Sequence, residues 1–232
     1  MAKKRISDVL IEVLANAGIE RIYGITGDSL NSVNDSLRRN GKIQFEHVRH
    51  EESAAFAAGA EALLTGKLTV CAGSSGPGNL HLINGLFDCH RNRVPVLAIA
   101  SHIPQSEVGL NYFQETHPEN LFKECSCFCE LVSNPKQMPE ILFRAMNAAV
   151  GNRDVAVIVL PGDVAVMETE IDKLPTWHAP KLPRVIPQSE DILEMVQHIN
   201  NGKRITLFCG AGCAGAHDEV VELATKLQAP VV

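Results

Sequence analysis

The chain has 232 residues, of which 45% are hydrophobic and 21% charged, and its formal net charge is −6. This composition is typical of a globular chain with enough apolar mass for a sizeable core. The acidic balance argues against a nucleic-acid partner, because phosphate binding requires a basic face. The basic start at Lys3, Lys4 and Arg5 is not followed by an apolar segment, so we expect neither a signal peptide nor a membrane span.

The seven cysteines have irregular spacings. Cys125, Cys127 and Cys129 form a C-x-C-x-C run, which differs from the C-x(2–4)-C pairs of zinc sites. We therefore predict no metal site here and place the three on one face of a strand. Without a secretory signal, reduced thiols and a cytoplasmic location are expected.

Short apolar runs alternate with segments of helical period through residue 160. The first predicted helix is capped by Ser7 and ends at Gly18, and the other helices are predicted at 30–39, 51–64, 79–91, 118–123 and 135–150. Strands are predicted at 21–25, 43–47, 68–72, 95–100, 127–131 and 155–160. This alternation predicts an α/β fold, with a parallel sheet covered by helices on both faces and ligands bound at the strands' carboxyl ends. The long polar loop 101–117 is a candidate functional segment.

We assign residues 1–170 to this first domain and the proline-rich stretch 171–187, which includes Pro175, to a linker. Residues 188–232 read as the start of a second, Rossmann-like α/β domain, with helices at 189–200 and 216–227 and strands at 204–209 and from Val231. A unit of about 45 residues could hardly bury its own core. We therefore expect the biological chain to continue past Val232.

Three glycine turns follow predicted strands and open helices. Gly210, Gly212 and Gly215 fit G-x-G-x-x-G, and the N–H groups of such a turn can hold a diphosphate. The acidic residue expected about 20 positions later would fall past Val232, so nucleotide binding and a structural turn are equally supported.

The other two turns lie in the first domain. Gly73 to Asn79 has glycines that would let a ligand approach the backbone, but it lacks the Gly-Lys-Ser/Thr of a P-loop. In the turn that contains Gly27, Asp28 stands at a helix start, where capping alone would explain it. Glu51 follows a strand and opens a helix, where the helix dipole favours a carboxylate.

Taken together, several segments resemble the thiamine-diphosphate-dependent enzymes. They are Arg49-His50-Glu51 with the Ala-rich helix after it, Gly73 to Asn79, Leu82 to Asp88, Val94 to Ile99 and Leu110 to Glu115. The likeness covers essentially the whole chain and is greatest to the flavin-linked pyruvate oxidases and quinone-linked pyruvate dehydrogenases. It implies a pyrimidine-binding domain over 1–170 and the beginning of a central, flavin-associated domain over 188–232.

The resemblance implies oxidative decarboxylation of pyruvate to acetate, with thiamine diphosphate, Mg²⁺ and FAD as cofactors and a quinone or oxygen as electron acceptor. The family's G-D-G…N metal motif is absent here, so the ligands of Mg²⁺ and of the diphosphate would lie outside this chain. In this family the active site lies between subunits, which implies a homodimer or homotetramer. Membrane contact, at the inner face of the cell membrane, would come only through sequence past Val232.

The resemblance also assigns roles to residues. Glu51 would hydrogen-bond N1′ of the cofactor's pyrimidine, Phe113 would supply an apolar wall, and Gln114 would bind the substrate carboxylate; for the last two, ordinary loop packing is the alternative. The same pocket would be lined by Gly27, Asp28, Ser75, Gly76 and Asn79. His81 and His90 are nine positions apart, too far round a helix to share a metal, and we expect them to be ordinary surface or core histidines.

Two alternatives stay open. An acetolactate synthase or another carboligase shares these motifs and would pass the intermediate to a second keto acid instead of to flavin. A non-catalytic chain that binds a nucleotide through Gly210 to Gly215 is the second. We expect the 232 residues alone to have no turnover.

Overall fold

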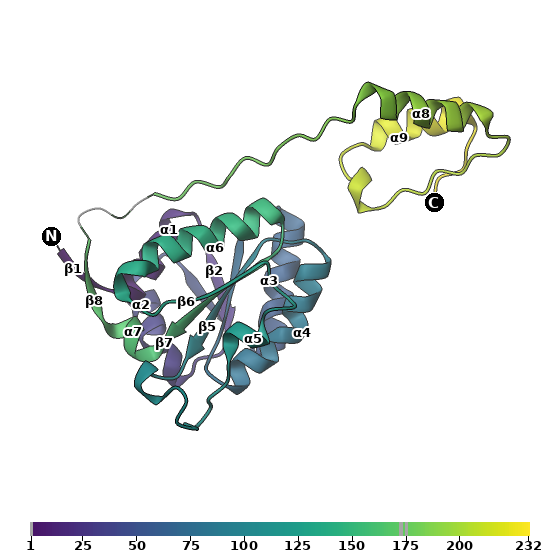
Figure 1. Cartoon of the computed structure of the whole chain (residues 1–232). Coiled ribbons are helices and arrows are strands. Elements are labelled where there is room, and N and C mark those ends of the chain that lie inside the picture. The colour runs from purple at the N-terminus through teal and green to yellow at the C-terminus, as the bar shows by residue number, and fades with distance from the viewer. Residues whose placement is uncertain (1, 172–173, 175) are drawn as a thin grey trace. The chain divides into compact units, whose positions relative to one another are not determined.

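The computed structural model describes residues 2–171, 174 and 176–232. The chain divides into two compact units, Met1–Leu182 and Pro183–Val232 (Figure 1). The predicted linker 171–187 includes residues 172, 173 and Pro175, which lie outside the described residues. Residues 176–188 form neither helix nor strand.

The first unit contains a six-stranded sheet of order β3-β2-β4-β5-β7-β6 in which every strand pair is parallel. The strands are β2 Arg21–Gly24, β3 Gln44–His47, β4 Thr69–Gly73, β5 Val96–His102, β6 Phe128–Leu131 and β7 Val155–Pro161. The predicted α/β fold with a parallel sheet is thus confirmed. Most predicted strand boundaries differ from the observed ones by one or two residues.

Helices cover both faces of this sheet, as Figure 1 shows. On β7, Ala156, Ile158 and Leu160 belong to one apolar core, which also includes residues of α1, α2, α6 and α7. The alternate residues Val155, Val157 and Val159 belong to a second core with α3 and α4. These helices are α1 Ile6–Asn16, α2 Asn31–Asn40, α3 Glu51–Thr65, α4 Pro77–Arg91, α6 Met138–Asn152 and α7 Gly162–Val166, and the short α5 is Pro118–Leu121. Burial on both faces explains why the central strands are continuous apolar runs.

Helices α3 and α4 approach each other closely because small residues meet between them. A Cβ placed on Gly85 of α4 would lie 2.5 Å from the Cβ of Ala55 and 2.8 Å from the carbonyl oxygen of Glu52. A Cβ on Gly59 of α3 would lie 2.6 Å from Sγ of Cys89. The Ala-rich composition of α3 therefore brings its first turn against α4.

The N-terminal segment differs from the prediction. Residues Ala2–Arg5 form strand β1, which pairs antiparallel with β8, Glu168–Ile171, and neither strand was among the predicted ones. Helix α1 begins at Ile6 with Arg5 at its N-cap, so Ser7 is not the cap; its hydroxyl is buried without a partner among the described residues. Pairing between segments so distant in sequence leaves no local pattern, which is why strands β1 and β8 were not predicted.

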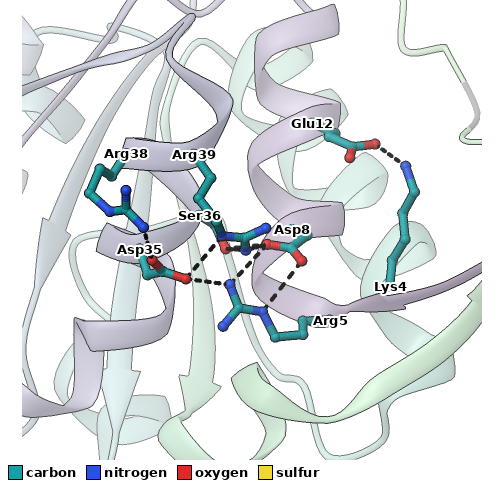
Figure 2. A network of polar contacts seen from close by, with 8 residues as sticks. All are labelled: Lys4, Arg5, Asp8, Glu12, Asp35, Ser36, Arg38 and Arg39. Atoms are coloured by element: carbon teal, nitrogen blue, oxygen red, sulfur yellow. Dashed lines mark hydrogen bonds and ion pairs between the residues drawn. The ribbon is translucent and has the colours of Figure 1, made fainter.

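An ion-pair network joins β1, α1 and α2 (Figure 2). Arg5 contacts Asp35 at 2.6 Å and Asp8 at 3.3 Å, and Asp8 also pairs with Arg39 and accepts a hydrogen bond from Ser36 at 2.5 Å. These groups are partly exposed, so solvent screening weakens each pair, but several charges in one network hold the N-terminal segment in place.

The C-x-C-x-C run does not lie on one strand face as predicted. Strand β6 begins at Phe128, so only Cys129 belongs to it, while Cys125 is buried ahead of the strand and Cys127 is exposed. Burial raises the pKa of Cys129 to about 12 and that of Cys125 to about 11. Both side chains are therefore neutral thiols at physiological pH.

The second unit contains α8, Ser189–Asn201, and α9, His217–Leu227. The predicted strands at 204–209 and Val231 are reduced to one parallel bridge between Leu207 and Val231. No residue of this unit is buried, and Phe208 remains 90% exposed. As the structure describes it, this unit has no buried core.

Candidate functional site

The predicted site turns meet at the carboxyl edge of the parallel sheet, and Ser29 connects them. Its hydroxyl lies 2.9 Å from Oγ of Ser74 and accepts a hydrogen bond of 2.9 Å from the backbone N–H of Ser75. Its carbonyl oxygen accepts a 2.6 Å hydrogen bond from Oγ of Ser101, at the end of β5. The ends of β2, β4 and β5 are therefore tied into one surface.

Glu51 is the buried carboxylate of this surface. It is the first residue of α3, after His50 at the N-cap, whose Nδ1 accepts a hydrogen bond from the N–H of Glu52. The Glu51 side chain is only 10% exposed, whereas that of Glu52 is 39% exposed. A helix start favours a carboxylate but does not require a buried one, so the dipole alone does not explain the position of Glu51.

His81 holds one oxygen of this carboxylate. Nδ1 of His81, on α4, lies 3.0 Å from Oε2 of Glu51. The His81 ring stacks on that of His50, with centroids 4.2 Å apart. His81 is a surface histidine as expected, with a side chain that is 43% exposed. Its contact with Glu51 was not predicted, because it depends on how α3 packs on α4.

The other oxygen of Glu51 borders a space kept open by a glycine. A Cβ on Gly78 would lie 3.2 Å from Oε1, and no donor among the described residues hydrogen-bonds this oxygen. A buried carboxyl with one fixed oxygen and one available oxygen is able to hold a proton shared with a ligand nitrogen. Oε1 of Glu51 is therefore available to a ligand that carries a hydrogen-bonding group.

Two more predicted residues occupy close-packed turn positions. Gly76 has φ +66°, and a Cβ there would lie 2.8 Å from Cβ of Gln114. A Cβ on Gly27 would lie 2.3 Å from Oγ of Ser74. Both positions thus require glycine, and they bring the first turn, the second turn and the 101–117 loop together.

In the long loop 101–117, Oε1 of Gln114 accepts a hydrogen bond of 3.3 Å from Oγ of Ser75, which lies in the turn after β4. Gln114 is exposed with φ +65°, and Phe113 is 80% exposed. Glu115 accepts hydrogen bonds from the N–H groups of Gly109 and Tyr112 at 2.6 and 3.1 Å, and these bonds hold its pKa below the usual range. The roles of Phe113 and Gln114 stay predictions.

Asn79 and Asp28 differ in their surroundings. Asn79 is fully buried and donates to the carbonyl oxygen of Ser101 at 2.8 Å, while its Oδ1 has no partner among the described residues. Asp28 is exposed and forms no capping hydrogen bond, so the capping explanation fails.

His102, which the sequence analysis did not single out, is buried at the end of β5, and this burial lowers its pKa.

In the second unit, Gly210 precedes a short 3₁₀ turn, Ala211–Cys213, and Gly215 has φ +86° two residues before α9. No atom lies within 4 Å of a Cβ placed on Gly210, Gly212 or Gly215. Nucleotide binding by this turn stays a prediction.

Within the described part of the chain, no three His, Cys, Asp or Glu side chains are grouped to hold a metal. None of the helices there has the length and apolar character needed to cross a membrane.

A parallel α/β domain with a buried carboxylate at the strands' carboxyl ends belongs to the class of ligand-binding domains that hold a cofactor at this edge. The sequence model described as "Thiamine pyrophosphate enzyme, N-terminal TPP binding domain" matches residues 4–121. The chain belongs to this thiamine pyrophosphate enzyme family.

Three relatives differ in what their names say. The chain is 60% identical to an "Uncharacterized 42.6 kDa protein in isoamylase 3'region" of Pseudomonas amyloderamosa, over 100% of this chain and 59% of the relative. It is 32% identical to a pyruvate oxidase of Lactiplantibacillus plantarum, over 96% of this chain and 38% of that enzyme. It is 33% identical to an acetolactate synthase of Arthrospira platensis, over 99% of this chain and 42% of that enzyme. The chain thus spans 38% to 59% of the length of these relatives.

Proposed function

We propose that this chain binds the pyrimidine ring of thiamine diphosphate through Glu51, in an enzyme that oxidatively decarboxylates pyruvate to acetate. Bound FAD would pass the electrons to a quinone or to oxygen. The family match supports cofactor binding, and the likeness to a pyruvate oxidase supports the oxidative reaction. The observation that carries the proposal is the buried Glu51 carboxyl, with Oε2 held by His81 and Oε1 available.

When bound, thiamine diphosphate supplies a nucleophilic carbon and an electron sink for decarboxylation. The chain's own task is to hold a carboxyl against the pyrimidine. Oε1 of Glu51 would hold the proton shared with the ring nitrogen, and Nδ1 of His81 would keep the carboxyl from rotating. Gln114, hydrogen-bonded to Ser75, is the proposed donor to the substrate carboxylate, and Phe113 the proposed apolar contact.

Mg²⁺ and the diphosphate would be held by residues outside this chain, and we propose that the site is completed in a homodimer or homotetramer.

The second candidate function is carboligation of the acetolactate synthase kind. The 33% identity to an acetolactate synthase is as high as the identity to the pyruvate oxidase and supports this alternative. Both reactions would use Glu51 in the same way.

Flavin absorbance tests the proposal. The natural full-length protein, loaded with thiamine diphosphate, Mg²⁺ and FAD, is mixed with pyruvate without oxygen, and we expect bleaching that depends on thiamine diphosphate. Glu51→Gln should slow bleaching by roughly a hundredfold or more, the range of a lost acid–base group. Glu52→Gln, its exposed neighbour in the same helical turn, is the matched control and should bleach normally.

The products separate the two reactions. Acetolactate formation without bleaching would reject the oxidase in favour of the carboligase. Undiminished turnover of Glu51→Gln would reject the role of Glu51 in either reaction.

A further inference from the structure

A cavity lies at the edge of the sheet opposite Glu51, where β5 and β7 begin. Its volume is about 290 Å³, and it is lined by His90, Arg91, Arg93, Asn152, Arg153 and Asp154. These residues come from the C-terminal ends of α4 and α6 and from the connections to the following strands. The cavity therefore has no residue in common with the site described above.

Positive charge dominates this cavity. Its one carboxylate, Asp154, is engaged by Nδ1 of His90 at 2.8 Å and by the N–H of Val155 at 2.6 Å. Elsewhere in the first unit, Arg5, Arg21, Arg38 and Arg39 each form an ion pair with a carboxylate. Arg144 lies over the ring of Phe128 instead, and Arg49 forms no ion pair with a described residue.

None of the three cavity arginines forms an ion pair with any residue that the structure describes. Nε of Arg153 donates to the carbonyl oxygen of Arg93 at 3.4 Å, which brings these two residues together and leaves the rest of the guanidinium group for a ligand. A chain with a net charge of −6 thus gathers three arginines around one hollow.

The backbone of two of these arginines adds a second observation. Arg93 has φ +52° and Arg153 has φ +53°, and both follow the end of a helix. Glycine or asparagine is preferred at such left-handed positions, because a Cβ crowds the neighbouring backbone. Both connections carry an arginine where glycine would suit the backbone better, and both arginines line the same cavity.

We propose that this cavity binds a phosphate-containing anion with two or more negative charges, of which pyrophosphate is the simplest. The guanidinium group offers paired donors that match phosphate oxygens. No Phe, Tyr or Trp is among the lining residues, so the cavity recognises the charged group and not a stacked base. The proposal does not depend on the function proposed for Glu51.

Pyrophosphate titration of the 232-residue chain, in a buffer free of phosphate and Mg²⁺, tests the proposal by calorimetry and by amide chemical shifts. We expect saturable binding that shifts the amides of Arg93, Val94 and Arg153. Arg93→Gln should weaken binding roughly tenfold or more, as expected for a lost charge-assisted contact. Arg204→Gln, which removes the same charge from an exposed position of the second unit, should change the affinity less than twofold.

Arg93→Gly guards against a trivial loss through misfolding, because glycine suits the left-handed backbone. It should fold normally and lose binding as Arg93→Gln does. Wild-type affinity in both Arg93 variants would overturn the proposal, as would shifts confined to the glycine turns near Glu51.

Discussion

The contact between α3 and α4 is what places Glu51 beside His81, and Gly85→Ala tests it. The new Cβ would lie 2.5 Å from the Cβ of Ala55, 2.8 Å from the carbonyl oxygen of Glu52 and 2.9 Å from the N–H nitrogen of Phe56. Two of these are backbone atoms and the third is a Cβ, so none of them is able to rotate away. The two helices must separate locally by about 1 Å to restore ordinary contact distances.

The expected magnitude follows from two opposing effects. Overpacking of this kind costs about 1–3 kcal/mol, whereas alanine is favoured over glycine in a helix by about 1 kcal/mol. Because backbone atoms are involved, we expect a net loss of about 1–2 kcal/mol in the free energy of unfolding. For a domain of this size the midpoint temperature should fall by about 2–8 °C.

Thermal and urea denaturation followed by circular dichroism measure this change. Gly151→Ala in α6 is the matched control, since nothing lies within 4 Å of its Cβ, and it should keep or raise the stability. Gly85→Ala, but not the control, should also weaken thiamine diphosphate binding by the full-length protein, because α3 carries Glu51. A Gly85→Ala protein as stable as the wild type would refute the close contact.

Two further predictions concern histidines. His81→Phe keeps a ring against His50 but removes Nδ1, so we expect thiamine diphosphate affinity and kcat to fall together by roughly tenfold, measured as cofactor KM and turnover. Unchanged values would mean that the contact between His81 and Glu51 is incidental. Burial lowers the pKa of His102 below its usual 6.5, although the carboxylates of Glu119 and Glu115 oppose the shift. Because the unfolded chain binds the proton first, stability should fall as the pH drops below 6.5, and urea denaturation at pH 7.5 and 5.5 should show a smaller fall in His102→Gln.

Much of the fold was predictable because its signals are local. The continuous apolar run of β7 reads as a strand buried on both faces, and the Ala-rich segment after Glu51 reads as a helix. The pairing of β1 with β8 was not predictable, because each segment is four residues long and its partner is more than 160 positions away. The expected strand at 204–209 did not form for a different reason: among the described residues no neighbouring strand pairs with it beyond the single bridge at Leu207.

The site was predictable as a set of turns but not as a set of contacts. Gly27, Ser75, Gly76 and Gln114 were assigned from motifs that resemble the family's, and the structure brings them to one surface. Their binding roles stay predictions. The hydroxyl of Ser29 that joins the turns was missed, since a serine in a polar turn carries no distinctive pattern. His81 was missed because its role depends on the register between two helices, which no local period encodes.

Helix α4 links the two ends of the first unit without making them one site. It begins at Pro77, next to Gly76 on the surface proposed to bind thiamine diphosphate. It ends at Arg91, which lines the cavity proposed to bind pyrophosphate. The cavity is built from the ends of α4 and α6, whereas the Glu51 contact depends on α3 and α4. A displacement of α3 by Gly85→Ala should therefore impair cofactor binding and leave pyrophosphate affinity unchanged, and Arg93→Gln should do the reverse. If either variant affects both ligands, the two surfaces are coupled through α4 and are not independent.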